Sequence, residues 1–339
     1  MIRLTLINFA LFFTFIWIGC TGKTENPPDA QNQIPADTES STDTQAQSDG
    51  VITADLSARQ PEDLGSSDGG KGEAYQDSGP PSPPEISIGD LPEELAGFKS
   101  YFSKYINIFG VHIVASSDTP DEKVLHAAKV MAHYLDNDKD GAPDNPKVVA
   151  EMTRSDGAAV LVMFKRFEDL ENSTLFESPL IYKYVGQDLI GIETHPEGSS
   201  DAKGFDATLE EVLHLITSAG YARAYPEVFG EDPGSSIAQA MDKARGGQWM
   251  SVPSQYPESA WYHYDDITCD YRCQVVEYFY WALTSLLGAQ NYGNRCSEIN
   301  IEWQLCTPES VEAGDPDIFK LITNPEYRLP TLLPTGEYP

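Results

Sequence analysis

The chain has 339 residues and is strongly acidic, with 53 Asp and Glu residues against 22 Lys and Arg residues and a formal net charge of −31 at pH 7. This charge argues against nucleic-acid binding, because a polyanion would be repelled, and it favours cation binding or plain solubility. Residues 91–339 are long enough for one large domain or two closely packed lobes.

Residues 1–20 have the features of an export signal. Arg3 precedes an apolar run from Leu4 to Ile18 that is too short to be a good spanning helix, and Gly19-Cys20 follows. The end of this run, from Trp17 to Cys20, resembles a bacterial lipoprotein processing site. The resemblance implies a chain that is lipidated at Cys20 and anchored in the bacterial cell envelope, at the outer membrane or the cell surface. The alternative is an ordinary secreted protein with an incidental cysteine.

Residues 21–90 differ in composition from the rest of the chain. They hold 14 Asp or Glu residues but three Lys or Arg residues and a single aromatic residue, Tyr75. Such a segment cannot bury enough apolar surface to offset the entropy lost on ordering. We therefore expect a disordered acidic tether, followed by a globular domain over residues 91–339.

The first distinctive motif of the domain is a calcium-type loop at residues 136–144. A helix is predicted from Pro120 to about Leu135, and a short helix from Asn145 to about Met152. Between them, carboxylates recur at positions one, three, five and nine of the loop: Asp136, Asp138, Asp140 and Asp144. Gly141 occupies the sixth position, where a calcium loop turns sharply, but Lys147 replaces the glutamate of the twelfth. We expect Ca²⁺ here, in a structural role that braces the two helices.

Three strands are expected next. Ala158–Phe164 has the composition of a buried strand, and Leu180–Val185 and Leu189–Thr194 are predicted as two more, joined by a turn at 186–188. A polar loop then leads to the second motif.

The second motif lies on a helix predicted between two capping residues, Asp206 and Gly220. Helical spacing puts Glu210 and His214 on one face, with Glu211 at its edge. In the metallopeptidase pattern H-E-x-x-H, two ligands stand at positions i and i+4 and the general-base Glu at i+1. Here Glu210 takes the first ligand position, and a carboxylate keeps the site able to bind a metal while changing its charge and metal preference. The alternative is the solvated face of an amphipathic helix.

A second predicted helix, residues 274–288, is apolar on nearly every side, and Glu277 is its only carboxylate. Burying an unpaired charge costs several kcal/mol, so Glu277 must be neutralised, ion-paired or bound to a metal. This order of elements resembles gluzincins, the zinc metallopeptidases of the thermolysin type, whose third ligand is a Glu on a helix downstream of the motif helix. The resemblance implies that Glu211 is the general base, that His214 and Glu277 are ligands, and that Glu210 stands where a ligand His is expected.

The same resemblance implies the fold and the chemistry. The fold would be α+β, a zincin-like domain with a mixed sheet, a motif helix and a buried downstream helix. The cofactor would be Zn²⁺ or another divalent transition metal, and the substrate a peptide or protein. Such peptidases pair extended substrate with a strand that precedes the motif helix.

His263, just before the second helix, is a further catalytic candidate. His263 or an adjacent Tyr would donate a hydrogen bond to an oxyanion, or His263 would complete the metal ligands in place of Glu210. The alternative is a surface residue without function.

Four cysteines follow in the last part of the chain: Cys269, Cys273, Cys296 and Cys306. An even number in an exported chain predicts two disulfides, with three pairings open, and a cysteine-rich metal site is the alternative. The sequence as a whole thus favours an exported, lipid-anchored, metal-dependent peptidase-like hydrolase. The alternative is a non-enzymatic surface binding lipoprotein, braced by calcium and stapled by disulfides.

Overall fold

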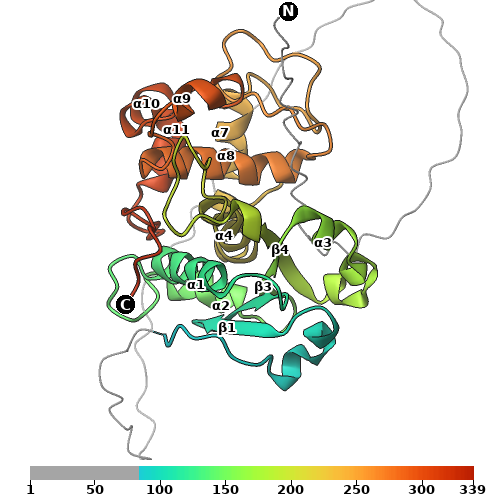
Figure 1. Cartoon of the computed structure of the whole chain (residues 1–339). Coiled ribbons are helices and arrows are strands. Elements are labelled where there is room, and N and C mark those ends of the chain that lie inside the picture. Colours follow the sequence, from blue (N-terminus) through green and yellow to red (C-terminus); the bar gives the residue numbers. More distant parts are fainter. Residues whose placement is uncertain (1–83) are drawn as a thin grey trace, which may run out of the picture. The chain divides into compact units, whose positions relative to one another are not determined.

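Short runs of β-branched and apolar residues form a four-stranded mixed sheet in the computed structural model, which describes residues 84–339 (Figure 1). In spatial order the strands are β1 (Lys104–Ile108), β2 (Val111–Ala115), β3 (Ala158–Phe164) and β4 (Tyr184–Ile190). β1 and β2 form an antiparallel hairpin, whereas β2, β3 and β4 run parallel. The two-residue hairpin loop needs positive φ at both positions, and Phe109 and Gly110 adopt 52° and 93°.

One predicted strand is confirmed and the next two are wrong. β3 has the predicted bounds, but Pro179–Tyr182 is a 3-10 helix and β4 runs straight through the predicted turn at 186–188. Gly186 and Asp188 pair with Val160 and Val162 of β3 and are buried. Gly, Gln and Asp are typical of turns, but here the neighbouring strand and α4 cover them.

The rest of the described chain is mainly helical. The α-helices are α1 (Asp121–Leu135), α2 (Pro146–Met152), α3 (Phe167–Glu171), α4 (Thr208–Ile216), α5 (Ala222–Ala224), α6 (Pro226–Phe229), α7 (Ser236–Ala244), α8 (Tyr271–Leu286), α9 (Arg295–Glu298), α10 (Pro308–Gly314) and α11 (Pro316–Ile322). Short 3-10 helices are Glu93–Ser100, Thr174–Glu177, Pro179–Tyr182, Gly191–Glu193 and Ile299–Ile301. The mixed helix-and-sheet architecture agrees with the expected α+β class.

The predicted helices over 120–135, 145–152 and 274–288 are confirmed within a few residues by α1, α2 and α8. Asn145 caps α2 by accepting the N–H of Val148, and Asp270 caps α8 by accepting the N–H of Cys273.

The predicted end of the motif helix at Gly220 is wrong. α4 passes into a π-helical turn, Thr217–Tyr221, and then into α5. Gly220 lies inside this turn, where a Cβ atom would come within 2.6 Å of Val148 on α2. The glycine therefore permits close helix packing rather than ending a helix.

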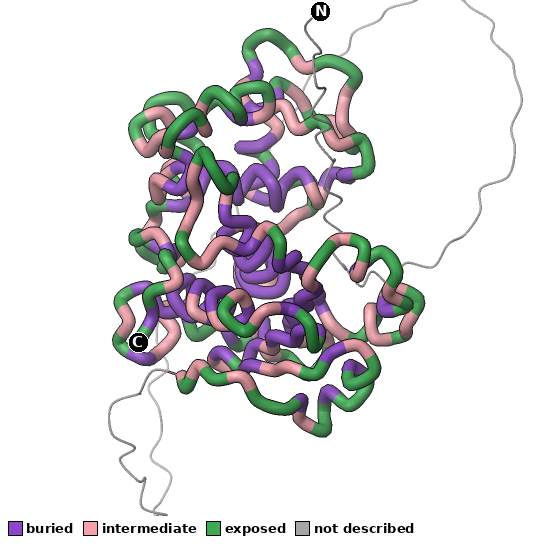
Figure 2. Tube along the Cα trace, in the orientation of Figure 1, coloured by how far each residue is buried: buried purple, intermediate pink, exposed green. Residues whose placement is uncertain are grey.

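α4 lies between the sheet and the helical part of the molecule (Figure 1). It contacts β3, β4 and α1 on one side and α8 on the other. Nearly all residues of α4 and α8 are buried, as Figure 2 shows. The opposite sheet face is covered by a smaller apolar cluster, with Leu95, Phe98 and Phe102 from the N-terminal part of the domain.

The domain begins before residue 91, because Ile86 and Ile88 pack against the main core and Gly89 pairs with Tyr105. The predicted signal segment 1–20 with its proposed lipidation residue Cys20, and the predicted tether up to residue 83, lie outside the described residues. Within residues 84–339, no helix combines the length and apolar character needed to cross a membrane.

The two predicted disulfides are confirmed, and the structure fixes their pairing. Cys269 is bonded to Cys273 and Cys296 to Cys306, with sequence separations of 4 and 10. Both bridges are therefore local staples of the helical part.

Candidate metal centre

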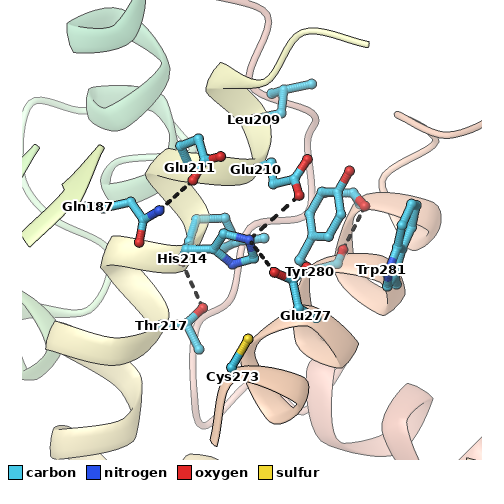
Figure 3. Close-up of polar contacts among 12 residues, drawn as sticks. Gln187, Leu209, Glu210, Glu211, His214, Thr217, Cys273, Glu277, Tyr280 and Trp281 are labelled. Atoms are coloured by element: carbon cyan, nitrogen blue, oxygen red, sulfur yellow. Dashed lines mark hydrogen bonds and ion pairs between the residues drawn. The ribbon is translucent and has the colours of Figure 1, made fainter. Parts of the chain in front are cut away.

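Two helices bring three side chains together as the motif predicts. α4 supplies Glu210 and His214 one turn apart, and α8 supplies Glu277 (Figure 3). The Nε2 atom of His214 lies 3.4 Å from Oε1 of Glu277 and 3.8 Å from Oε1 of Glu210. Ligand atoms of the three residues all lie within 4.8 Å of one another. In a tetrahedral site with bonds of about 2.1 Å, ligand atoms are about 3.4 Å apart, so these side chains fit a transition-metal ion.

The burial of these atoms also fits a cation. The side chains of His214 and Glu277 are 0% and 2% exposed. Within residues 84–339, neither nitrogen of His214 nor Oε1 of Glu277 has a hydrogen-bond partner. Buried polar atoms are nearly always paired, and a shared cation would satisfy Nε2 and Oε1 together. An ion pair between protonated His214 and the two carboxylates is the competing arrangement.

Negative charge accumulates around this single histidine. Burial raises the pKa of Glu277 to about 7, with His214 lowering it and Glu210 raising it. Burial lowers the pKa of His214, but the carboxylates of Glu277 and Glu210 outweigh burial and leave the pKa above its ordinary value. Burial, helped by nearby carboxylates, also raises the pKa of Glu193 and of Glu302 to about 8. A divalent cation would lower these pKa values and stabilise the charged forms.

Glu211 lies next to the three-residue group and is not part of it. Its side chain points toward β4, where Nε2 of Gln187 donates a hydrogen bond of 2.5 Å to Oε2 of Glu211 (Figure 3). Burial, together with Glu210, Asp188 and further carboxylates, raises the pKa of Glu211 well above its ordinary value. Glu211 is thus a buried carboxyl whose protonation depends on the charge of the neighbouring group.

The structure places the other predicted catalytic residue, His263, against Tyr256, with ring centroids 5.3 Å apart. Its backbone N–H donates to the carbonyl of Glu302, and burial lowers the pKa of its ring. The adjacent Tyr264 lies close enough to Glu277 to lower the pKa of that carboxyl.

Two residues near the group were not predicted. The ring of Tyr280 lies edge-on to His214, with centroids 5.5 Å apart, and its hydroxyl accepts a hydrogen bond from Gln290. Its position three residues after Glu277 puts both on one face of α8, and this spacing was a usable signal. Gln187 carried no such signal, because its role depends on β4 packing against α4.

The calcium-type loop gathers three of its four predicted ligands. Carboxylate oxygens of Asp136, Asp138 and Asp140 lie within 4.8 Å of one another. Asp144 is outside that group, and its Oδ2 accepts the backbone N–H of Asn137 at 2.6 Å, which closes the loop. Asp136 is fully buried and also accepts a hydrogen bond from the hydroxyl of Tyr338.

Comparisons with family models, with curated proteins and with solved structures found no match for this chain. The interpretation of these side chains as a metal site therefore depends on their geometry alone.

Proposed function

We propose that the chain is a metal-dependent hydrolase with a zincin-like centre, in which Glu210, His214 and Glu277 bind Zn²⁺ or another divalent transition metal. One observation carries the proposal: two buried atoms, Nε2 of His214 and Oε1 of Glu277, have no hydrogen-bond partner among the described residues and lie 3.4 Å apart, with a second carboxylate 3.8 Å from the nitrogen. These separations are those of neighbouring ligands on one ion.

A divalent ion held there would polarise a substrate carbonyl and acidify water. Glu211 acts as general base: with a cation beside it, its pKa falls and its carboxylate accepts a proton from water. Gln187 holds one of its oxygens by a hydrogen bond and so fixes the orientation of the carboxylate. Tyr264, which lies near Glu277, would donate its hydrogen bond to the developing oxyanion once Glu277 binds the ion. Two carboxylates and one imidazole neutralise a divalent ion fully, so we expect slower turnover than at a site with two histidines.

The substrate in this proposal is a peptide or protein, and the chain works outside the cytoplasm, held in the bacterial cell envelope by lipid at Cys20. The two disulfides support an oxidising compartment. Ca²⁺ at Asp136, Asp138 and Asp140 would have a structural role, since the loop joins α1 to α2. Its carboxylates form a group separate from that of Glu210, His214 and Glu277.

The test is elemental analysis of the purified chain after exhaustive dialysis, in the wild type and in Glu277→Gln. We expect one tightly held transition-metal ion in the wild type and its loss in the variant. Glu302→Gln is a matched control, because Glu302 is a partly buried carboxylate near Glu277 but contributes no atom to the group. A wild type that retains calcium alone would instead identify a calcium-braced binding protein.

A further inference from the structure

A cavity of about 520 Å³ is lined mainly by the segment 218–235, which follows the motif helix, and by one residue of α8. Its wall includes Ser218, one turn beyond His214 along the motif helix, and Arg272, at the start of α8. The carboxylate of Glu231, also in this wall, is close enough to contribute to the raised pKa of His214. The cavity therefore lies close to His214, one of the candidate metal ligands.

Both arginines that line the cavity have hydrogen-bond partners. Arg272 makes a two-point contact with Asp232, at 2.8 and 2.7 Å. Arg223 donates to the carbonyl of Gly157 at 2.8 Å. Oε1 of Glu231, in contrast, is buried and has no hydrogen-bond partner among the described residues.

An unpaired buried acceptor in a cavity of this size is suited to a donor from a ligand. Leaving such an acceptor unpaired is costly, and a charged partner satisfies it best. Burial raises the pKa of Glu231, while Ser218 and Arg272 lower it. These two residues therefore partly stabilise the charged carboxylate.

We propose that this cavity is a subsite for a basic side chain of a bound polypeptide, with the ammonium group of Lys or the guanidinium group of Arg on the carboxylate of Glu231. The inference rests on the proposed function for its polypeptide substrate. The binding chemistry itself depends only on the cavity.

The first experiment measures binding of small probes to the full chain by calorimetry. Butylguanidine carries the cationic end of an Arg side chain, and butylurea is its neutral counterpart of the same shape. We expect the wild type to bind butylguanidine with a Kd on the order of 1 mM and butylurea at least about tenfold more weakly. Equal binding of both probes, or binding of neither, would overturn the proposal, and this comparison needs no variant to fold.

The second experiment compares two variants that remove one negative charge each. Glu231→Gln should weaken butylguanidine binding about tenfold or more, because a charge-assisted hydrogen bond is lost. Glu227→Gln is the matched control, since Glu227 lines the same cavity but is exposed, and it should change little. If Glu231→Gln binds butylguanidine as the wild type does, Glu231 is a neutral buried acid and the inference is wrong.

A third comparison separates a polypeptide side chain from a free amine. Peptides that differ only in Lys or norleucine at one position are scanned for hydrolysis, and for binding if no hydrolysis is found. Preference for Lys that disappears in Glu231→Gln supports the subsite. Butylguanidine binding without any Lys preference would overturn the polypeptide part, whereas failure of hydrolysis alone would count against the proposed function and leave the probe results standing.

Discussion

The charge state of Glu277 leads to a prediction about the pH dependence of metal binding. A metal ligand must be deprotonated, so each group that is protonated in the free protein must release its proton when the ion binds. Burial raises the pKa of Glu277 to about 7, and the pKa of His214 is raised above its ordinary value by neighbouring carboxylates. The proton on Glu277 must therefore leave when zinc binds below about pH 7, in addition to any proton that His214 releases.

The size of the effect follows from this one proton. Affinity falls about tenfold per pH unit for each proton released, so the proton of Glu277 adds about one tenfold step per unit to the pH dependence below about pH 7. Above about pH 7 this contribution of Glu277 should disappear. With an ordinary pKa near 4.5, Glu277 would be ionised throughout this range and only the histidine proton would be released.

The assay is competition between the full chain and a chelator of known affinity, at intervals from pH 5.5 to 8. We expect the slope below pH 7 to be steeper by about one in the wild type than in Glu277→Gln, with weaker binding at every pH in the variant. Glu302→Gln should keep the slope of the wild type. Equal slopes in the wild type and Glu277→Gln would refute the assignment of Glu277 as a buried ligand that titrates near pH 7.

Three further predictions concern activity and stability. Glu211→Gln should keep the metal and lower kcat by about 10² to 10⁴, as loss of a general base does, and a variant that loses the metal as well would assign Glu211 to binding. Calcium chelation should lower the Tm of the wild type but not of the double variant Asp138→Ala and Asp140→Ala, whereas an equal decrease in both would place calcium elsewhere. Because burial raises the pKa of Glu193 and Glu302 to about 8, their contribution to stability is full below their ordinary pKa and is lost as pH rises through 8. The Tm of chelator-treated protein should therefore decrease between pH 6 and 9, and zinc addition should reduce that decrease.

The residues that converge on the candidate centre could be predicted because local rules place them. Helical spacing puts Glu210 beside His214. A single carboxylate in an apolar helix needs a partner for its charge, and this singled out Glu277 as a candidate ligand. The contact between α4 and α8 depends on tertiary packing, so it could be predicted from the sequence only through the resemblance to a known family.

The predictions that failed depended on tertiary burial. Gly186 and Asp188 have turn-forming side chains, yet packing against β3 and α4 holds them in a strand. Gly220 was predicted to end the helix, but its missing side chain instead allows α2 to pack closely against it. The contact of Tyr264 with Glu277 was equally hidden, since the segment before α8 has no regular structure from which to infer a side-chain direction.

The positions of the two disulfides indicate what an ion bound by His214 and Glu277 would add to the stability of the fold. Both bridges close short loops, with separations of 4 and 10 residues, so each restricts the unfolded chain less than a long-range cross-link would. An ion shared by His214 and Glu277 would instead close a loop of 63 residues and tie α4, packed on the sheet, to α8 in the helical part. In the loop-closure account, a cross-link of that span removes on the order of 4 kcal/mol of unfolded-chain entropy. Such an ion would connect α4 to α8, whereas each disulfide connects only neighbouring segments within the helical part.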